Sequence, residues 1–228
     1  MAEPALRVLR TGGLWFDGVD DRVEFLFDMD YKNFTICFWF YLPYVFGNPH
    51  PFYSRSLTGM GYFTSETRYG RGIRFASRSS DTNEYIDVTV VTDVSQVGKW
   101  NFACMVRNGT LLTAYFNTYI GTSQDTRSGR SFRFRISMGE DPNWGGGRGT
   151  SRLIDEVRVY ERALSAGEVS EIRDRGTLIK DGLVLYLPLY EGEGNIAHDV
   201  SGYGNHGTIY GGAMWVVKKA LRVLPKAR

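Results

Sequence analysis

The stretch RLIDEVRVYERALSAGEVSEIRDRG, residues 152–176, decides the fold of this chain. Its first part is rich in β-branched and aromatic residues, which predicts a strand in a packed sheet. Ser165 stands three residues before Glu168, the spacing of a helix capping box, and Gly176 is the residue type that most often ends a helix. We therefore expect a buried strand, a tight turn and a short helix over 166–175.

The composition of the whole chain is typical of many short strands joined by glycine turns. Aromatic residues make up 14% of the 228 residues, and there are 27 glycines but only 7 prolines. The formal net charge of +2 is too small to argue for nucleic acid or for an anionic membrane surface as a partner. No apolar run approaches the roughly 18 to 20 residues of a membrane span, so we expect no membrane insertion.

Other segments predict further strands and the turns between them. Residues 34–42 are apolar on both faces, as in a strand at the middle of two packed sheets. Asp17-Gly18 is expected to reverse the chain tightly between two strands, and Asn108-Gly109 to form a hairpin into residues 110–121. Residues 43–53 and 62–80 are predicted to be irregular segments at the rim.

The two cysteines, Cys37 and Cys104, both fall in apolar strand patterns. A pair of buried thiols is the favoured interpretation, because a disulfide requires Cβ atoms to meet, which a sequence alone does not show. The N-terminus lacks the apolar segment and cleavage site of a secretory signal. An extracellular, cell-surface or virion location would then follow from a trimmed chain or from release inside a virus particle.

Four segments resemble the laminin-G-like, concanavalin A-like jelly-roll family: LWFDGVDDRVEF, LIDEVRVYERALSAGEV, LVLYLPLYEGEG with DVSGYGNHGTIYGG, and WNFACMVRNGTLLTAYFNTYIG. The resemblance implies an all-β fold, a two-sheet antiparallel β-sandwich with one short α-helix, as a single domain over 1–228. The family contains carbohydrate-binding modules, lectins, adhesins and structural modules, so it implies recognition without fixing the ligand.

The order of these segments departs from the usual pattern of the family. The segment containing LVLYLPL and GNHGTIYGG normally comes first, whereas here it comes last. The sequence ALRVL occurs at 5–9 and again at 220–224, which marks the same junction at both ends. We interpret this as a circular permutation in which 177–228 supplies the permuted first strands and 218–228 is a basic tail. The last strands are then expected to pair with their own chain or, by strand exchange, with a neighbour.

Catalysis is not expected from the pattern of acidic residues. Glycosidases need two carboxylic acids that converge on the scissile bond, and alternate residues of a strand would provide them. Asp155 and Glu156 are adjacent instead, and should point to opposite faces. The histidines His50, His198 and His206 lie in separate turns without the spacing of metal ligands.

Calcium is the cofactor that the resemblance implies. Ca²⁺ takes six to eight oxygen ligands, and the matched positions are Asp17 with Asp20 or Asp21 in the first turn, and Asp155 in the last family strand. The structural alternative is that Asp17 forms an Asx-type turn with Gly18, while Asp155 bonds backbone amides or an arginine. The sequence leaves both open.

Sugar binding requires an exposed aromatic face and planar polar groups for the hydroxyls. The candidate residues lie on two loops and are Trp144, Asn143 and Asp141 on one, and Tyr44, His50 and Tyr53 on the other. For each aromatic taken singly, capping the end of the core is the favoured alternative, since Trp and Tyr are usually largely buried.

The sequence thus predicts a non-catalytic, lectin-like carbohydrate-binding module displayed on a surface or a particle. The alternative function is a structural protein of a virion, filament or cell surface whose copies associate through their chain ends. The expected partners are a glycan or neighbouring subunits of a homo-oligomer.

Overall fold

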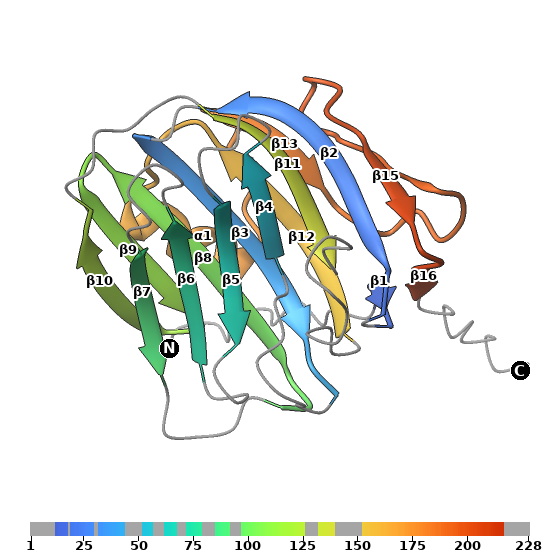
Figure 1. Ribbon diagram of the computed structural model, residues 1–228, viewed down its shortest axis with the longest axis horizontal. Coiled ribbons are helices and arrows are strands. Elements are labelled where there is room, and N and C mark those ends of the chain that lie inside the picture. Colours follow the sequence, from blue (N-terminus) through green and yellow to red (C-terminus); the bar gives the residue numbers. More distant parts are fainter. Residues whose placement is uncertain are drawn as a thin grey trace, which may run out of the picture.

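The computed structural model describes residues 12–17, 19–29, 32–43, 52–56, 62–67, 72–78, 85–91, 97–125, 132–139 and 152–216. These residues form two antiparallel sheets packed face to face, with the helix α1 (Ala166–Arg175) outside one of them (Figure 1). The predicted all-β sandwich with a short helix is confirmed. Within the described ranges, no helix is long and apolar enough to cross a membrane.

Sheet A carries the helix on its outer side and contains eight strands. In spatial order they are β10 (Tyr119–Gln124), β9 (Leu111–Phe116), β8 (Trp100–Asn108), β3 (Asn33–Tyr41), β12 (Arg152–Tyr160), β1 (Gly13–Phe16) and β16 (Met214–Val216), with β13 (Leu183–Leu187) also beside β12.

Sheet B also contains eight strands and forms the other layer. In spatial order they are β14 (Ile196–Ala197), β15 (Gly207–Tyr210), β2 (Arg22–Met29), β11 (Phe132–Gly139), β4 (Phe52–Ser56), β5 (Tyr62–Thr67), β6 (Gly72–Arg78) and β7 (Tyr85–Val91).

Strand β3 lies in the middle of sheet A and is buried on both faces, as its sequence predicts. Successive side chains of a strand alternate between faces. The residues at positions 34, 36, 38 and 40 are phenylalanine or isoleucine and lie in the core between the sheets. Cys37 and Trp39 face the other way, into a second apolar cluster that includes Val169 and Ile172 of α1.

The expectation of two free thiols is wrong. Cys37 lies directly opposite Cys104 in the ladder between β3 and β8, and a disulfide joins them. Both residues are fully buried beneath α1. The register of two central strands brings the Cβ atoms together, and this long-range pairing is not visible in the sequence.

The turn after β1 does not form the expected hairpin. β1 belongs to sheet A and β2 to sheet B, so the chain crosses from one layer to the other at this turn. Both edges of β1 are already occupied, by β12 on one side and β16 on the other. Because β2 has no free edge of β1 to pair with, it must enter the opposite sheet.

Residues 62–80 were expected to be irregular, but most of them form β5 and β6. Ile73 and Phe75 are buried in the core, whereas Arg74 between them reaches Asp87 of β7, with 3.0 Å between Nε and Oδ2. The sequence did not reveal this strand, because its short alternation of apolar and polar side chains lies among polar residues. Phe52 and Tyr53, expected at the end of a loop, likewise begin β4.

The hairpin at Asn108-Gly109 is confirmed, and a second turn follows it closely. Residues 111–124 divide into β9 and β10 around Asn117, whose φ is 54°. The Asn117 side chain stabilises this turn, because its Oδ1 accepts a hydrogen bond from the backbone N of Phe102 at 2.9 Å.

The C-terminal strands join both sheets of the same chain. β13 pairs with β12, β15 pairs with β2, and β16 pairs with β1. The residues after α1 therefore supply sheet strands, as the permuted order predicts. The basic tail 218–228 and both copies of ALRVL lie outside the described residues, and the permutation itself remains a proposal.

Candidate functional site

The turn from β1 to β2 brings together three carboxylates, Asp17, Asp20 and Asp21, which we call the acidic turn. One oxygen of each lies within 4.8 Å of the others. The backbone N of Asp17 donates to Oδ2 of Asp21 at 2.7 Å, and the backbone N of Val19 donates to Oδ1 of Asp17 at 2.8 Å. The second bond is the Asx-type turn expected as the structural alternative. It holds the acidic side chains close to one another.

Asp21 is the buried member of the acidic turn, with 2% of its surface exposed. Its Oδ1 is buried and finds no hydrogen-bond partner among the described residues. Burial raises the pKa of Asp21, and the charges of Asp17 and Asp20 act in the same direction. A buried carboxylate oxygen without a donor is suited to receive a proton or a cation.

The turn between β15 and β16 packs directly on the acidic turn. A Cβ at Gly211 would lie 2.5 Å from the carbonyl oxygen of Asp20, so only glycine fits there. Gly212 lies next to Asp21, since a Cβ there would be 3.9 Å from Oδ1. The C-terminal segment of the chain therefore packs on the backbone of the acidic turn and beside the Asp21 carboxylate.

Asp155 does not lie at the acidic turn. It lies beside Gly13, at the start of β1, because a Cβ on that glycine would be 3.5 Å from the Asp155 Cβ. Asp17 follows four residues later, about 13 Å along an extended strand. Next to Asp155, the ladder with β3 is irregular, and Glu156 has a φ of 48°. The simple alternation that we assumed for these two acids therefore fails at this bulge.

Most of the predicted sugar-binding residues lie outside the described residues: Trp144, Asn143, Asp141, Tyr44 and His50. Tyr53 lies in β4, opposite Thr64 of β5. Their grouping into a sugar site remains a prediction.

A second buried aspartate, Asp199, organises the turn between β14 and the glycine-rich segment before β15. Its Oδ1 accepts hydrogen bonds from the backbone N of Tyr186 and Ser201, each at 2.9 Å. Its Oδ2 accepts from Ser201 Oγ at 2.8 Å and from the backbone N of Asn205 at 2.9 Å. Each oxygen thus accepts two hydrogen bonds, and these bonds fix the path of residues 199–205.

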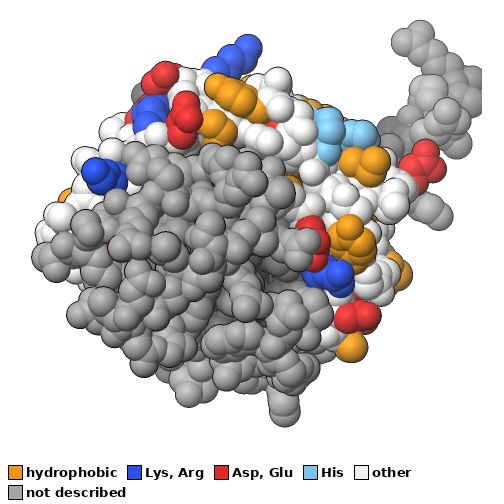
Figure 2. Space-filling model, turned by 45° about the horizontal axis from the view of Figure 1, so that its top comes forward, with side chains coloured by type: hydrophobic (Ala, Val, Ile, Leu, Met, Phe, Trp, Pro, Cys, Tyr) orange, Lys and Arg blue, Asp and Glu red, His pale blue; other side chains and the backbone are white. Residues whose placement is uncertain are grey.

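This turn orients His206. The backbone N of Asp199 donates to Nδ1 of His206 at 2.9 Å, so the neutral imidazole carries its proton on Nε2. His198 packs against it edge to face, with the ring centroids 5.4 Å apart. Both imidazoles are exposed and form the pale-blue patch in Figure 2. The protein therefore presents an oriented N–H donor at its surface.

Two highly exposed tyrosines lie in the same segment of the chain. Tyr203 is 64% exposed within the turn, and Tyr190 is 71% exposed beside Glu191, whose Oε1 accepts a hydrogen bond from the backbone N of His198. We call Tyr190, His198, Tyr203 and His206 the His–Tyr surface. The sequence analysis identified only a glycine-rich turn here. The signal it missed is Asp199 placed two residues before Ser201, a pattern typical of a side chain that bonds the following backbone.

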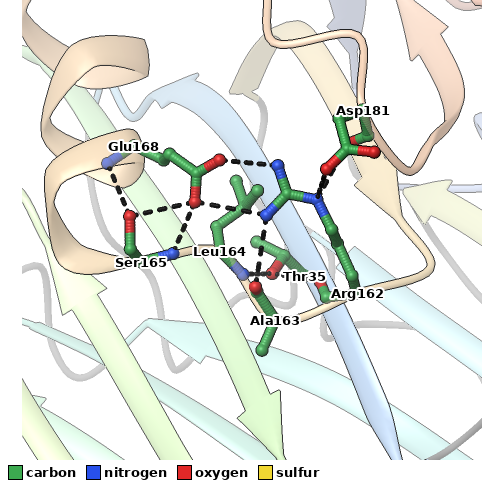
Figure 3. Close-up of polar contacts among 7 residues, drawn as sticks. All are labelled: Thr35, Arg162, Ala163, Leu164, Ser165, Glu168 and Asp181. Carbon is green, nitrogen blue, oxygen red and sulfur yellow. Dashed lines mark hydrogen bonds and ion pairs between the residues drawn. The ribbon is translucent and has the colours of Figure 1, made fainter.

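A third polar cluster fixes the start of α1 and is structural (Figure 3). Arg162 binds both oxygens of Glu168, at 2.6 and 3.2 Å, and its Nε lies 2.8 Å from Oδ2 of Asp181. The Arg162 hydrogen bonds and those from Ser165 lower the pKa of Glu168 to about 2. The predicted capping box of Ser165 and Glu168 is present, and Gly176 ends the helix with φ 66°.

Comparison with known proteins identifies the family. A family model described as the concanavalin A-like lectin/glucanases superfamily matches residues 17–170, about two thirds of the chain. The chain belongs to this superfamily. The match begins at the acidic turn and ends within α1, so β13 to β16 lie beyond it. No curated protein sequence matches the chain.

Solved structures of low sequence identity share the fold. A heptameric SAP-like pentraxin from Limulus polyphemus is 14% identical, with a TM-score of 0.63 over 92% of this chain and 96% of that chain. A proposed carbohydrate-binding protein from Bacteroides ovatus is also 14% identical, with a TM-score of 0.62 over 92% of this chain and 61% of that chain. The CBM40 of a Ruminococcus gnavus IT-sialidase, bound to alpha2,3 sialyllactose, is 12% identical, with a TM-score of 0.50 over 73% of this chain and 96% of that chain.

Proposed function

We propose that this protein is a non-catalytic carbohydrate-binding module and that the His–Tyr surface holds the sugar. The observation that carries the proposal is an imidazole, His206, whose donor atom is fixed, in a segment of the chain that also carries two highly exposed tyrosine rings. Membership of a superfamily named for lectins and glucanases supports it, as do the carbohydrate-related proteins that share the fold.

The chemistry of the His–Tyr surface suits a pyranose. The apolar face of a sugar ring stacks on exposed aromatic rings, while its hydroxyls accept hydrogen bonds from fixed donors. Tyr190 and Tyr203 offer such rings, and Nε2–H of His206 offers the donor. Because Asp199 fixes the turn through four hydrogen bonds, little ordering is required when the sugar binds.

We also propose that the acidic turn binds calcium. Asp17, Asp20 and Asp21 fit a hard cation because their oxygens converge and Oδ1 of Asp21 is buried without a donor. A bound Ca²⁺ would neutralise this cluster and brace the crossing between the two sheets against the turn at Gly211. Asp155 is not part of this proposed site, since it lies at the other end of β1.

The loop that contains Trp144, Asn143 and Asp141 remains a proposed second contact for the glycan, as do Tyr44, His50 and Tyr53. Longer glycans commonly contact more than one loop, so the two surfaces are separable by mutation.

One acid of the β12 strand, Glu156, supports a binding role over a hydrolytic one. Oε2 of Glu156 lies 3.1 Å from Nη2 of the buried Arg158, so this carboxylate is engaged in an ion pair within the protein. Display outside the reducing cytosol, on a cell surface or a particle, is supported by the buried disulfide between Cys37 and Cys104.

A glycan array tests the proposed sugar site. We expect the intact protein to bind a defined set of glycans and Tyr203→Ala to lose at least tenfold in affinity, because stacking on the ring is removed. Tyr119→Ala is the matched control, since Tyr119 is also exposed but lies in β10, at the far edge of sheet A. Trp144→Ala measures the second loop separately. Binding that Tyr203→Ala and Tyr190→Ala leave unchanged would remove the His–Tyr surface, and absence of any binding would contradict the function.

A further inference from the structure

The outer face of sheet A carries large apolar side chains on five neighbouring strands, β8, β3, β12, β1 and β16. At one end of the sheet these side chains stand next to one another across the strands. In spatial order they are Trp100, Tyr41, Leu153, Trp15 and Met214. We call these five residues the aromatic row.

The ladders of the sheet fix the direction of the aromatic row. Each of its members lies directly opposite the next one in the register of two paired strands. Leu14, Phe40 and Ile154, which are neighbours of row members in the sequence, belong to the core between the sheets. Because successive side chains of a strand point to opposite faces, the aromatic row points away from sheet B.

The side chains of the aromatic row reach the surface. Met214 is 60% exposed, and the other four members are partly exposed. The helix α1 packs on another part of the same face, over the disulfide between Cys37 and Cys104. Tyr41 follows Cys37 by four residues in β3, about 13 Å along the strand. The row therefore lies beyond the part of the sheet to which α1 contributes its apolar side chains.

The shape of the aromatic row limits what it can bind. Neighbouring strands are about 4.8 Å apart, so a row across five strands is about 19 Å long. Two residues further along β12 and β1, the outward positions are Asp155 and Gly13, and the apolar surface is interrupted there. A stable interface between proteins buries about 800 Å² on each partner, which a single row of five side chains does not supply. A long and narrow surface suits a linear chain.

We propose that the aromatic row binds a single extended polysaccharide chain along its length. The proposal rests on the carbohydrate-binding function proposed above, but it assigns a different set of side chains to it. Trp15, Tyr41 and Trp100 offer rings on which successive pyranose rings stack. Asp155, at the next outward position of β12, offers carboxylate oxygens that accept hydrogen bonds from sugar hydroxyls.

The orientation of two rings favours one chain over a flat crystalline surface. The ring centroids of Tyr41 and Trp100 are 5.9 Å apart, and the ring planes are tilted by 57°. The row is therefore not a plane, and the twist of a sheet turns each strand further relative to the last. A single polysaccharide chain can follow such a surface, whereas the face of a crystal cannot.

Affinity electrophoresis tests the aromatic row. The probes are gels that contain hydroxyethylcellulose, xylan or laminarin, three soluble polysaccharides with different linkages. We expect at least one of them to retard the intact protein, and Trp15→Ala and Trp100→Ala each to weaken that binding at least tenfold. Trp15→Phe should keep most of the binding because it keeps a ring, whereas Trp15→Leu should lose it although it stays apolar. An unchanged circular dichroism spectrum verifies the fold of each variant.

Two controls separate this site from the His–Tyr surface and from surface aromatics in general. Tyr119→Ala, an exposed tyrosine of β10, should leave the retardation unchanged. Tyr203→Ala should also leave it unchanged if the polysaccharide is bound by the row. Retardation that Tyr203→Ala abolishes and Trp15→Ala leaves intact would overturn the row and keep the His–Tyr surface. The reverse pattern, together with a glycan array that Tyr203→Ala does not alter, would keep the row and remove the His–Tyr surface.

Mass measurement by light scattering tests a protein partner in place of the polysaccharide. We expect the intact chain and Trp15→Ala to have the same mass in solution. A dimer of the intact chain that Trp15→Ala dissociates would make the aromatic row an interface between copies, and would overturn the proposal. Absence of retardation by all three polysaccharides would overturn it as well.

Discussion

Two buried aspartates in this sandwich have opposite surroundings. Asp199 is 7% exposed and accepts four hydrogen bonds, two on each oxygen. Asp21 is 2% exposed and its Oδ1 has no donor among the described residues, while two further carboxylates lie close to it. A buried carboxylate that accepts hydrogen bonds on both oxygens acts as a structural element. A buried carboxylate with one oxygen that lacks a donor is suited to bind a proton or a cation.

The comparison predicts that Asp199→Ala has the largest effect on stability. The change leaves three backbone amides and a hydroxyl without their acceptor, and such buried groups are costly. We expect a loss of about 3 kcal/mol in the free energy of unfolding, measured by denaturant titration. Asp181→Ala is the control, because its side chain is 84% exposed and its ion pair with Arg162 is worth about 1 kcal/mol or less. Equal losses in the two variants would contradict the assignment of Asp199.

Stabilisation of the protein by calcium should depend on Asp21 and not on Asp199. At a concentration 100 times the dissociation constant, calcium is expected to stabilise the intact protein by about 2.7 kcal/mol, seen as a rise in Tm. Asp21→Asn should abolish that gain. Without calcium this variant should lose less than about 1 kcal/mol, since it keeps a hydrogen-bond acceptor and removes a buried charge. An intact protein whose Tm is the same in calcium and in EDTA would remove the metal proposal.

The raised pKa of Asp21 adds a pH dependence to the same experiment. Burial holds the pKa of Asp21 above its usual range in the calcium-free protein, so protons compete with the cation at a higher pH than they would at an exposed aspartate. Calcium binding near that pKa should therefore release protons, which calorimetry in two buffers of different ionisation enthalpy detects. Asp21→Asn should release fewer.

A third carboxylate, Glu168, extends the comparison, because its pKa is shifted in the opposite direction from that of Asp21. The expected effect on stability is smaller. Its pKa is about 2, below the usual 4.5, because Arg162 and Ser165 bind the ionised form. The stability that it contributes is complete above pH 4.5 and disappears as the pH falls toward 2. The difference between intact protein and Glu168→Gln, about 1 kcal/mol or less for this partly exposed pair, should therefore close within that window. A difference that stays constant from pH 6 to pH 2 would contradict the role of the ion pair.

The sequence predicted those elements whose signals are local. The capping box at Ser165 and Glu168 and the glycine at 176 lie within twelve residues, and the helix occurs where they place it. The strand over 34–42 was recognisable because both of its faces are apolar. The aromatic and glycine content was enough for the class of fold, which the pairing of the sheets confirms.

Features decided by distant strands could not be predicted in the same way. The disulfide depends on the register that sets Cys37 against Cys104, 67 residues later. The turn at Asp17 has the residues of a hairpin, but β12 and β16 fill both edges of β1 and send the chain to the other sheet. The same register separates Asp155 from the acidic turn. Of the candidate site, the acidic cluster was foreseen, whereas the oriented His206 depends on a bond to Asp199 that no spacing rule indicated.

Because Gly13 and Val216 are neighbours in the sheet, the described sandwich is suited to an engineered circular permutation. A short peptide joining these two residues would close the described sandwich into a ring. The exposed link 177–181 between α1 and β13 could then be opened, because it carries no strand pairing. The recircularised protein would begin with β13 and end with α1, which is the segment order that the proposed circular permutation would have started from.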